Sequence, residues 1–426
     1  MVLVDFSVEN FGPFRDRVIF SLQSTNIKDH PCNTIGCDAI NGSLLSSSIV
    51  IGPNASGKSF LIKALKALQF MVLDAYPESI HYRWYTPCKL DSECLKKPTS
   101  IGIRLVEEGI LYDYSISFTS NAVTYENLNY YPKKRVKNVF RRDLNKDEKK
   151  GKARLFQLMN SASSYLAIGA KYNDDICSRV YNAIHNMILL ESQDVTNLPV
   201  LSCNYVGSDP KKKGILLKGL QMADFGIVDY VREDMNVDEE ELRQNIPPAM
   251  LDKLYKLPNN KGSAVTRNIL WLEHEYSGPN GILSPTKFEM NEEESTGTRY
   301  MFGIMGPMVD SLLNGRPIII DEFGSHLHPM LSRWLIELYS EENNPNHGQL
   351  ICITHDLSLI DTKDLLRRDQ IYFTDKDRRT GLSTLYCLSD FKGTRSNDLM
   401  LKAYLLGRYD AIPMIRHGSI LDGEKN

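Results

Sequence analysis

Apolar and polar residues alternate at the start of the chain, from Val2 to Glu9 and again from Val18 to Leu22. A period of two residues is typical of a β-strand with one buried face, and residues 10–13 between the two runs are turn formers. The pattern therefore predicts an opening β-hairpin. Between residues 99 and 131, further alternating segments separated by turn residues predict an antiparallel sheet.

A second pattern begins at Ser47, where a short apolar run leads into a glycine-rich segment. From Lys58 to Met71 the apolar residues then follow the 3.6-residue period of a helix. This order predicts a buried strand, a loop and a helix in direct succession.

Apolar runs of strand length and segments with helical period alternate again towards the C-terminus. The expected elements are a helix at 301–313, a strand at 317–320, a helix at 330–339, a strand at 349–354 and a hairpin at 371–388. Residues 155–260 have a mostly helical pattern. We therefore expect an α/β fold in three parts: 1–130 and 286–426 as the two halves of a core, and 131–285 as a large, mostly helical insertion.

The glycine-rich segment matches the pattern G-x-x-x-x-G-K-[ST] in full, in the strand and helix context that a phosphate-binding loop requires. Its residues are Gly52, Pro53, Asn54, Ala55, Ser56, Gly57, Lys58 and Ser59. Backbone N–H groups of such a loop surround a phosphate at a helix N-terminus. Lys58 is expected to reach the β- and γ-phosphates of ATP, and the Ser59 hydroxyl to bind Mg²⁺.

Two adjacent carboxylates, Asp321 and Glu322, end the apolar strand that starts at Pro317. A strand that ends in acidic residues is common and indicates little alone. Together with a phosphate loop, the pair predicts a Mg²⁺ ligand in Asp321 and a base in Glu322 that activates the attacking water.

Two further segments complete the set of motifs. Ser295, Gly297 and Thr298 precede an apolar helix, a pattern that is equally typical of a helix N-cap. His355 follows the strand 349–354 and is the candidate sensor of the γ-phosphate, although a lone histidine is more often structural.

Together these motifs resemble the ABC-type P-loop ATPases related to SMC and RecF proteins, and more closely the AAA-family ATP-binding proteins of abortive-infection loci, of the AbiL and RloA type. The resemblance extends to the Asn10-Phe11 turn, to residues 325–329 and to a C-terminal segment from Tyr404 to Pro413. Two departures stand out. His328 occupies the place of the aspartate that ends the D-loop of ABC transporters, and neither Gln69 nor Gln157 is in a convincing context for a Q-loop glutamine.

The resemblance implies an ATPase that works as a head-to-tail homodimer or higher oligomer, in which Ser295, Gly297 and Thr298 contact the nucleotide of the other subunit. It also implies a regulatory role in antiviral defence, with a separately encoded nuclease or toxin as effector. The alternatives are an SMC- or RecF-like DNA repair ATPase, a transporter subunit, and a nuclease that uses Asp375 and Asp377. For that last pair, a charged hairpin turn is the favoured interpretation.

Composition changes this picture only locally. The 50 Lys and Arg residues nearly balance 53 Asp and Glu residues, but residues 133–154 hold eleven basic residues against three acidic ones. Either this run is a solvated loop or its members bind DNA or RNA phosphates. The candidate contacts are Lys133, Lys134, Arg135, Arg141 and Arg142.

The eight cysteines include no C-x-x-C pair, which favours a reduced protein without disulfides. Because the N-terminus has no apolar block and no apolar run reaches the length of a membrane span, we expect a cytoplasmic protein without a membrane partner.

Overall fold

The computed structural model describes residues 1–77, 80, 84–191, 197–236, 266–277, 283–361, 363–391 and 400–412. The chain forms two compact units, Met1–Ser192 with Ser311–Asn426 and Gln193–Asp310. This division differs from the insertion expected at 131–285, because residues 131–192 belong to the first unit and residues 286–310 to the second.

The centre of the first unit is a six-stranded sheet with the order β11-β15-β16-β5-β17-β18. Its strands are β5 (Ser47–Ile51), β11 (Ile188–Leu190), β15 (Pro317–Ile320), β16 (Gln349–Ile353), β17 (Ile371–Lys376) and β18 (Ser383–Cys387). All pairings are parallel except that of β17 with β18. Every residue of β5, β15 and β16 is buried, as expected for strands inside a parallel sheet.

A seven-stranded antiparallel sheet with the order β10-β9-β8-β7-β6-β1-β2 forms the other layer of this unit. Its strands are β1 (Val2–Glu9), β2 (Val18–Ser21), β6 (Thr99–Glu107), β7 (Ile110–Phe118), β8 (Val123–Tyr130), β9 (Lys137–Asp143) and β10 (Glu148–Lys150). A separate ribbon contains β3 (Thr34–Cys37) and β4 (Gly42–Leu45). Buried and partly exposed residues alternate along β6 and β7, so the sheet buries one face and leaves a polar one.

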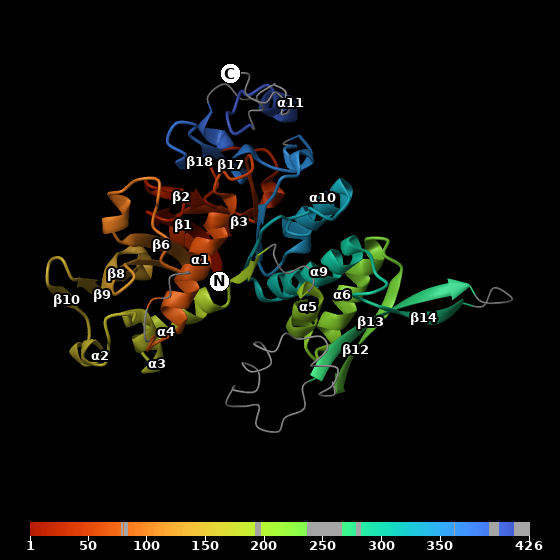
Figure 1. The fold of residues 1–426 in the computed structure, drawn as a ribbon, viewed down its shortest axis with the longest axis horizontal. Coiled ribbons are helices and arrows are strands. Elements are labelled where there is room, and N and C mark those ends of the chain that lie inside the picture. The colour runs from red at the N-terminus through yellow and green to blue at the C-terminus, as the bar shows by residue number, and fades with distance from the viewer. Residues whose placement is uncertain are drawn as a thin grey trace, which may run out of the picture. The chain divides into compact units, whose positions relative to one another are not determined.

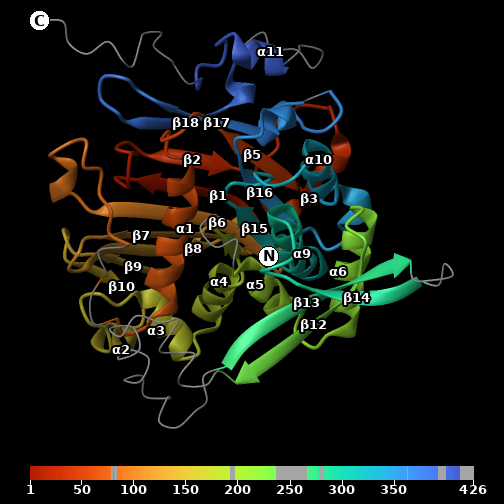
Figure 2. The ribbon, with the colours of Figure 1, turned by 45° about the vertical axis from the view of Figure 1, so that its right-hand side comes forward.

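Helix α1 packs against strands of both layers, and Figure 2 shows it crossing in front of the antiparallel sheet near β6. The helices of this unit are α1 (Lys58–Leu73), α2 (Ala153–Gln157), α3 (Tyr165–Lys171), α4 (Asp175–His185), α10 (Pro329–Glu337) and α11 (Met400–Leu405). One apolar core joins Leu61, Leu65 and Leu68 of α1 to residues of both sheets. The helix that follows the phosphate loop is thereby fixed along its length.

The second unit contains a small antiparallel sheet in addition to helices. Its elements are α5 (Leu198–Val206), α6 (Pro210–Met222), β12 (Ile227–Asn236), β13 (Thr266–Ser277), β14 (Leu283–Glu289) and all but the last turn of α9 (Thr296–Asn314), labelled in Figure 1. Tyr230 of β12 packs edge-on against Phe302 of α9, with ring centroids 5.1 Å apart. The α/β class is confirmed, but the three strands correct the expectation of a mostly helical insertion.

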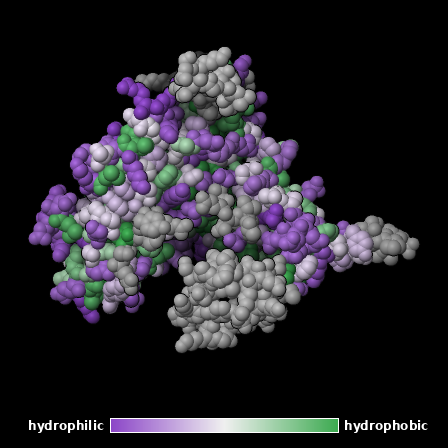
Figure 3. Space-filling model, in the orientation of Figure 1, coloured by the Kyte–Doolittle hydropathy of each residue, from purple (hydrophilic) through white to green (hydrophobic). Residues whose placement is uncertain are grey.

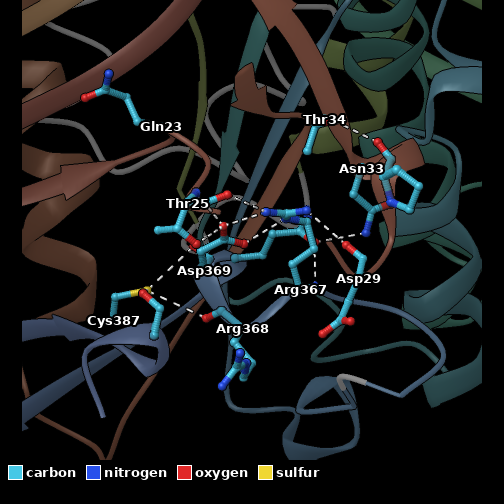
Figure 4. A network of polar contacts seen from close by, with 12 residues as sticks. Gln23, Thr25, Asp29, Asn33, Thr34, Arg367, Arg368, Asp369 and Cys387 are labelled. Atoms are coloured by element: carbon cyan, nitrogen blue, oxygen red, sulfur yellow. Dashed lines mark hydrogen bonds and ion pairs between the residues drawn. The ribbon is translucent and has the colours of Figure 1, made fainter. Parts of the chain in front are cut away.

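A buried ion pair ties the loop after β2 to the start of β17 (Figure 4). The Arg367 guanidinium donates from Nε and Nη2 to the carboxylate of Asp369, at 2.9 and 2.8 Å, and from Nη1 to the carbonyl of Asp29 at 2.9 Å. The backbone N–H and the hydroxyl of Thr25 both donate to Asp369. The side chains of Arg367 and Asp369 are only 3% and 2% exposed.

We predict that Asp369→Asn lowers the free energy of unfolding by about 3–5 kcal/mol, because it leaves the Arg367 charge buried without its carboxylate. Urea unfolding measures the change. The double replacement Arg367→Met with Asp369→Leu should lose less, and Glu93→Gln, in the exposed pair with Lys96, less than about 1 kcal/mol. Equal losses for Asp369→Asn and Glu93→Gln would contradict the role of the pair.

Candidate nucleotide-binding site

The phosphate loop leaves β5 at Gly52 and enters α1 at Lys58. Gly57 is the N-cap residue of α1 with a φ of 98°, a conformation that glycine adopts without strain. No side chain caps this helix N-terminus, whereas Ser164 caps α3 and Asp174 caps α4. An uncapped helix start offers its first N–H groups and its dipole to an anion.

Lys58 lies beneath this loop with only 6% of its surface exposed. Its Nζ donates to the carbonyls of Gly52 and Pro53, at 2.8 and 2.9 Å. Burial lowers the pKa of Lys58 to about 8, and the charges of Asp321 and Glu322 oppose that shift. A buried ammonium held by neutral carbonyls suits a phosphate, whose negative charge would balance that of the ammonium.

Asp321 and Glu322 lie at the end of β15. The Asp321 carboxylate is 5% exposed and accepts hydrogen bonds from the Ser59 hydroxyl and, at 3.1 Å, from the Glu322 N–H. Burial raises the pKa of Asp321, and the Ser59 hydrogen bond opposes the rise. Glu322 is exposed and has a φ of 52°. One hydroxyl and one carboxylate, both oxygen groups of the kind that Mg²⁺ prefers, therefore lie next to each other at the end of β15.

His355 comes from β16, the strand that lies between β15 and β5. Thr354, just before it, donates from its N–H to the Val50 carbonyl at 3.0 Å and from its hydroxyl to the Phe323 carbonyl at 2.7 Å. Burial lowers the pKa of His355, the Lys58 charge lowers it further, and Glu322 opposes both. His355 is therefore neutral near pH 7 and lies within electrostatic reach of both residues.

The Asn10-Phe11 turn packs against the first turn of α1, where the rings of Phe11 and Phe60 meet edge-on. Asn10 adopts a φ of 52°, and its amide donates to the carbonyls of Cys94 and Lys97, at 2.8 and 3.0 Å. Gly12 packs so closely on Phe60 of α1 that a Cβ there would be 2.1 Å from the ring. The turn is thus a structural support for α1, which the sequence pattern alone did not reveal.

Residues 295–298, the signature segment, lie in the second unit. Ser295 is exposed and caps α9, since its hydroxyl accepts from the Thr298 N–H at 3.1 Å and contacts the Thr298 hydroxyl at 2.9 Å. Gly297 is partly exposed and Thr298 is buried. The preceding Glu294 contacts His274 Nε2 at 2.7 Å, which connects the segment to β13. In the single chain, these residues therefore form a capped helix start.

The structure assigns structural roles to several other candidates. Gln69 donates to the carbonyls of Ile184 and Met187, at 2.9 and 3.0 Å, and so joins α1 to the end of α4. His328 caps α10 by accepting from the Met330 N–H. Asp377 accepts hydrogen bonds from the N–H groups of Arg379 and Thr380 in the turn between β17 and β18. This agrees with the prediction that Asp375 and Asp377 belong to a charged hairpin turn.

The basic run is not one solvated loop, because most of it forms β9, β10 and α2. Arg142 is 5% exposed and donates to the carbonyls of Ser163 and Val123, so its expected contact with nucleic acid is wrong. Arg141 pairs with Glu148 at 3.1 Å. Lys133, Lys134 and Arg135 are exposed. Figure 3 shows hydrophilic and hydrophobic residues mixed on the surface over β9, β10 and α2.

The parallel sheet, with a phosphate loop, two carboxylates and a histidine at the ends of neighbouring strands, defines an ABC-type P-loop ATPase domain. Residues 47–182 and 284–361, just over half of the chain, match the family described as "AAA domain, putative AbiEii toxin, Type IV TA system". The chain belongs to this family. No curated protein matches the sequence.

Solved structures that resemble this chain include two SMC heads. The SMC head domain from Thermotoga maritima has 12% identity and a TM-score of 0.41, over 91% of this chain and 99% of that one. The SmcHead bound to the C-winged helix domain of ScpA has 12% identity and a TM-score of 0.40, over 91% of this chain and 97% of that one. Within the described residues, no helix is long and apolar enough to cross a membrane.

Proposed function

We propose that the protein hydrolyses ATP at a composite site, which one copy supplies with the phosphate loop and a second copy with the signature segment. The observation that most supports nucleotide binding at the phosphate loop is the contact of Ser59 with Asp321 beside the buried ammonium of Lys58. Hydroxyl, carboxylate and ammonium are the three groups that a P-loop needs to hold a nucleotide with Mg²⁺.

Each residue then has a defined role. The loop N–H groups and Lys58 bind the phosphates, while Ser59 and Asp321 would hold Mg²⁺, which supplies charge neutralisation on the phosphate oxygens. Glu322 accepts the proton of the attacking water. His355 is neutral near pH 7 because its pKa is lowered, and the one N–H of the neutral ring can donate a hydrogen bond to the γ-phosphate.

Pairing with a second copy is supported by the exposure of the groups that would meet it. Ser295 and Glu322 are both exposed, and so is the segment 325–330 after Glu322 apart from partly exposed Leu327. Met330, a large apolar side chain in the first turn of α10, is 72% exposed and could be buried against a second copy. A head-to-tail dimer would cover these residues and bring the N-terminus of α9 to the other copy's nucleotide.

The composite site predicts that ATPase activity per protein molecule rises with protein concentration until the dimer is saturated. Steady-state phosphate release across a dilution series measures this dependence. A specific activity that stays constant down to concentrations at which light scattering detects only monomers would count against a site shared between copies.

We further propose that this ATPase regulates a separately encoded toxin or nuclease in antiviral defence. The family description, which refers to an AbiEii toxin and a type IV toxin-antitoxin system, supports this role. The test is phage plating on bacteria that express the natural locus with intact chain or with Glu322→Gln. Equal plating efficiency on both strains and on a strain without the locus would exclude the role under those conditions.

A nucleic-acid contact at Lys133, Lys134 and Arg135 remains a proposal that rests on their exposure and positive charge. Neutralising the three is expected to reduce the slope of log affinity against log salt by about 0.9 for each phosphate that the variant no longer neutralises. The matched control neutralises Lys376, Arg378 and Arg379, which are also exposed and lie at the end of β17 and in the turn after it. The same slope in both variants would indicate a merely solvated segment.

A further inference from the structure

Strand β17 touches the phosphate loop through a pair of buried hydroxyls. Ser56 Oγ lies 2.6 Å from Thr374 Oγ1, and both side chains are fully buried. Thr374 reaches this position because β17 runs parallel to β5, with Phe373 opposite Ile51, the last residue before the loop. One hydrogen bond thus joins the middle of the loop to a strand that carries none of its motifs.

The loop fits closely against its surroundings on this side. A Cβ at Gly52 would lie 2.3 Å from the Thr374 carbonyl oxygen and 2.4 Å from its hydroxyl, so only glycine fits there. A Cβ at Gly57 would lie 2.9 Å from Pro13 and 3.2 Å from the Ser383 hydroxyl. Displacement of Thr374 would therefore be transmitted to the loop directly.

The C-terminal segment 400–412 packs on the residue next to Thr374. The rings of Tyr404 and Tyr409 stack on Phe373, with centroids 5.6 and 5.8 Å away. The Tyr404 hydroxyl donates to the Ala411 carbonyl at 2.6 Å, and the Tyr386 hydroxyl donates to the Tyr409 carbonyl at 2.7 Å. The C-terminal segment has no assigned role in the nucleotide site. These contacts pack it against the strand that carries Thr374.

We propose that Thr374 is a positioning residue for the phosphate loop, and that segment 400–412 maintains its position through Phe373. The Thr374 hydroxyl holds Ser56 so that the loop N–H groups keep their direction before nucleotide arrives. A preorganised loop binds phosphate more tightly than a mobile one, because the loop does not have to become ordered on binding. The inference rests on the proposed nucleotide binding at this loop.

The test compares Thr374→Val, which keeps the shape and loses the hydroxyl, with Thr374→Ser, which keeps the hydroxyl. In Thr374→Val, backbone hydrogen exchange of residues 52–57 without nucleotide should be about tenfold faster, and the Kd for ATP about tenfold higher, since Ser56 is left unsatisfied. Turnover at saturating ATP should change by less than about twofold. Thr374→Ser should restore both exchange and affinity.

A second variant tests the role of the C-terminal segment and leaves Thr374 itself unchanged. Tyr409→Leu removes one ring from Phe373 and should accelerate exchange at residues 52–57 in the same direction, whereas Leu406→Ala, at a side chain 76% exposed, should not. Because hydrogen exchange is measured without nucleotide, its result tests the positioning role of Thr374 even if the protein turns out not to hydrolyse ATP. Unchanged exchange and Kd in Thr374→Val, or equal effects in Thr374→Ser, would overturn it.

Discussion

Replacement of Lys58 by alanine is expected to weaken ATP binding by about 100-fold or more, because a buried charge contact of this kind contributes a few kcal/mol. The ammonium is already dehydrated and held by two loop carbonyls, so nothing else in the loop replaces its charge. Equilibrium binding of a fluorescent ATP analogue measures the loss. An affinity within about threefold of the unsubstituted protein would contradict the role of Lys58.

The matched control is Lys63→Ala on the same helix, where the ammonium lies over the Phe60 ring and is partly exposed. This variant should bind ATP normally. The pKa of Lys58, about 8, adds a dependence on pH. Bound phosphate favours the charged form and raises this pKa, so binding takes up a proton above about pH 8. The Kd for ATP should therefore rise between about pH 7 and about pH 9, but not in Lys58→Ala.

The second large effect is expected for Glu322→Gln, which should slow ATP hydrolysis by a factor of about 10²–10⁴ without loss of ATP binding. The amide keeps the shape of the side chain but accepts no proton from water. ATP should therefore hold the variant as a dimer, which light scattering would detect.

Glu341→Gln, at an exposed position after α10, is the matched control and should hydrolyse ATP at the normal rate. Hydrolysis by Glu322→Gln at the unsubstituted rate would remove Glu322 from its role as base. A variant that stays monomeric with ATP would instead speak against closure of the composite site.

The parts of the site that the sequence predicted are those encoded locally. Gly52 to Ser59 form their loop from eight consecutive residues, and Asp321, Glu322 and His355 each follow a buried strand. Parallel strands bring their carboxyl ends to one edge of the sheet. Consecutive motifs of this kind therefore predict which side chains converge, even when hundreds of residues separate them.

Contacts between distant segments could not be predicted in this way. Arg142 belongs to a basic run, but its burial depends on the carbonyls of Val123 and Ser163, which only the folded sheet brings to it. Thr374 carries no motif, and its relation to Ser56 arises from the order of strands in the sheet. The strands β12 and β13 pair across a long stretch of chain, so no short pattern marked them as partners.

The most direct test of the central claim mixes two inactive variants, Ser295→Arg and Lys58→Ala. In a mixed dimer, one of the two sites combines the intact phosphate loop of the first variant with the intact signature segment of the second. Each variant alone should lack ATPase activity, Ser295→Arg should still bind ATP as a monomer, and the mixture should recover part of the activity. Loss of ATP binding by monomeric Ser295→Arg, with a mixture no more active than its components, would contradict a site shared between two copies.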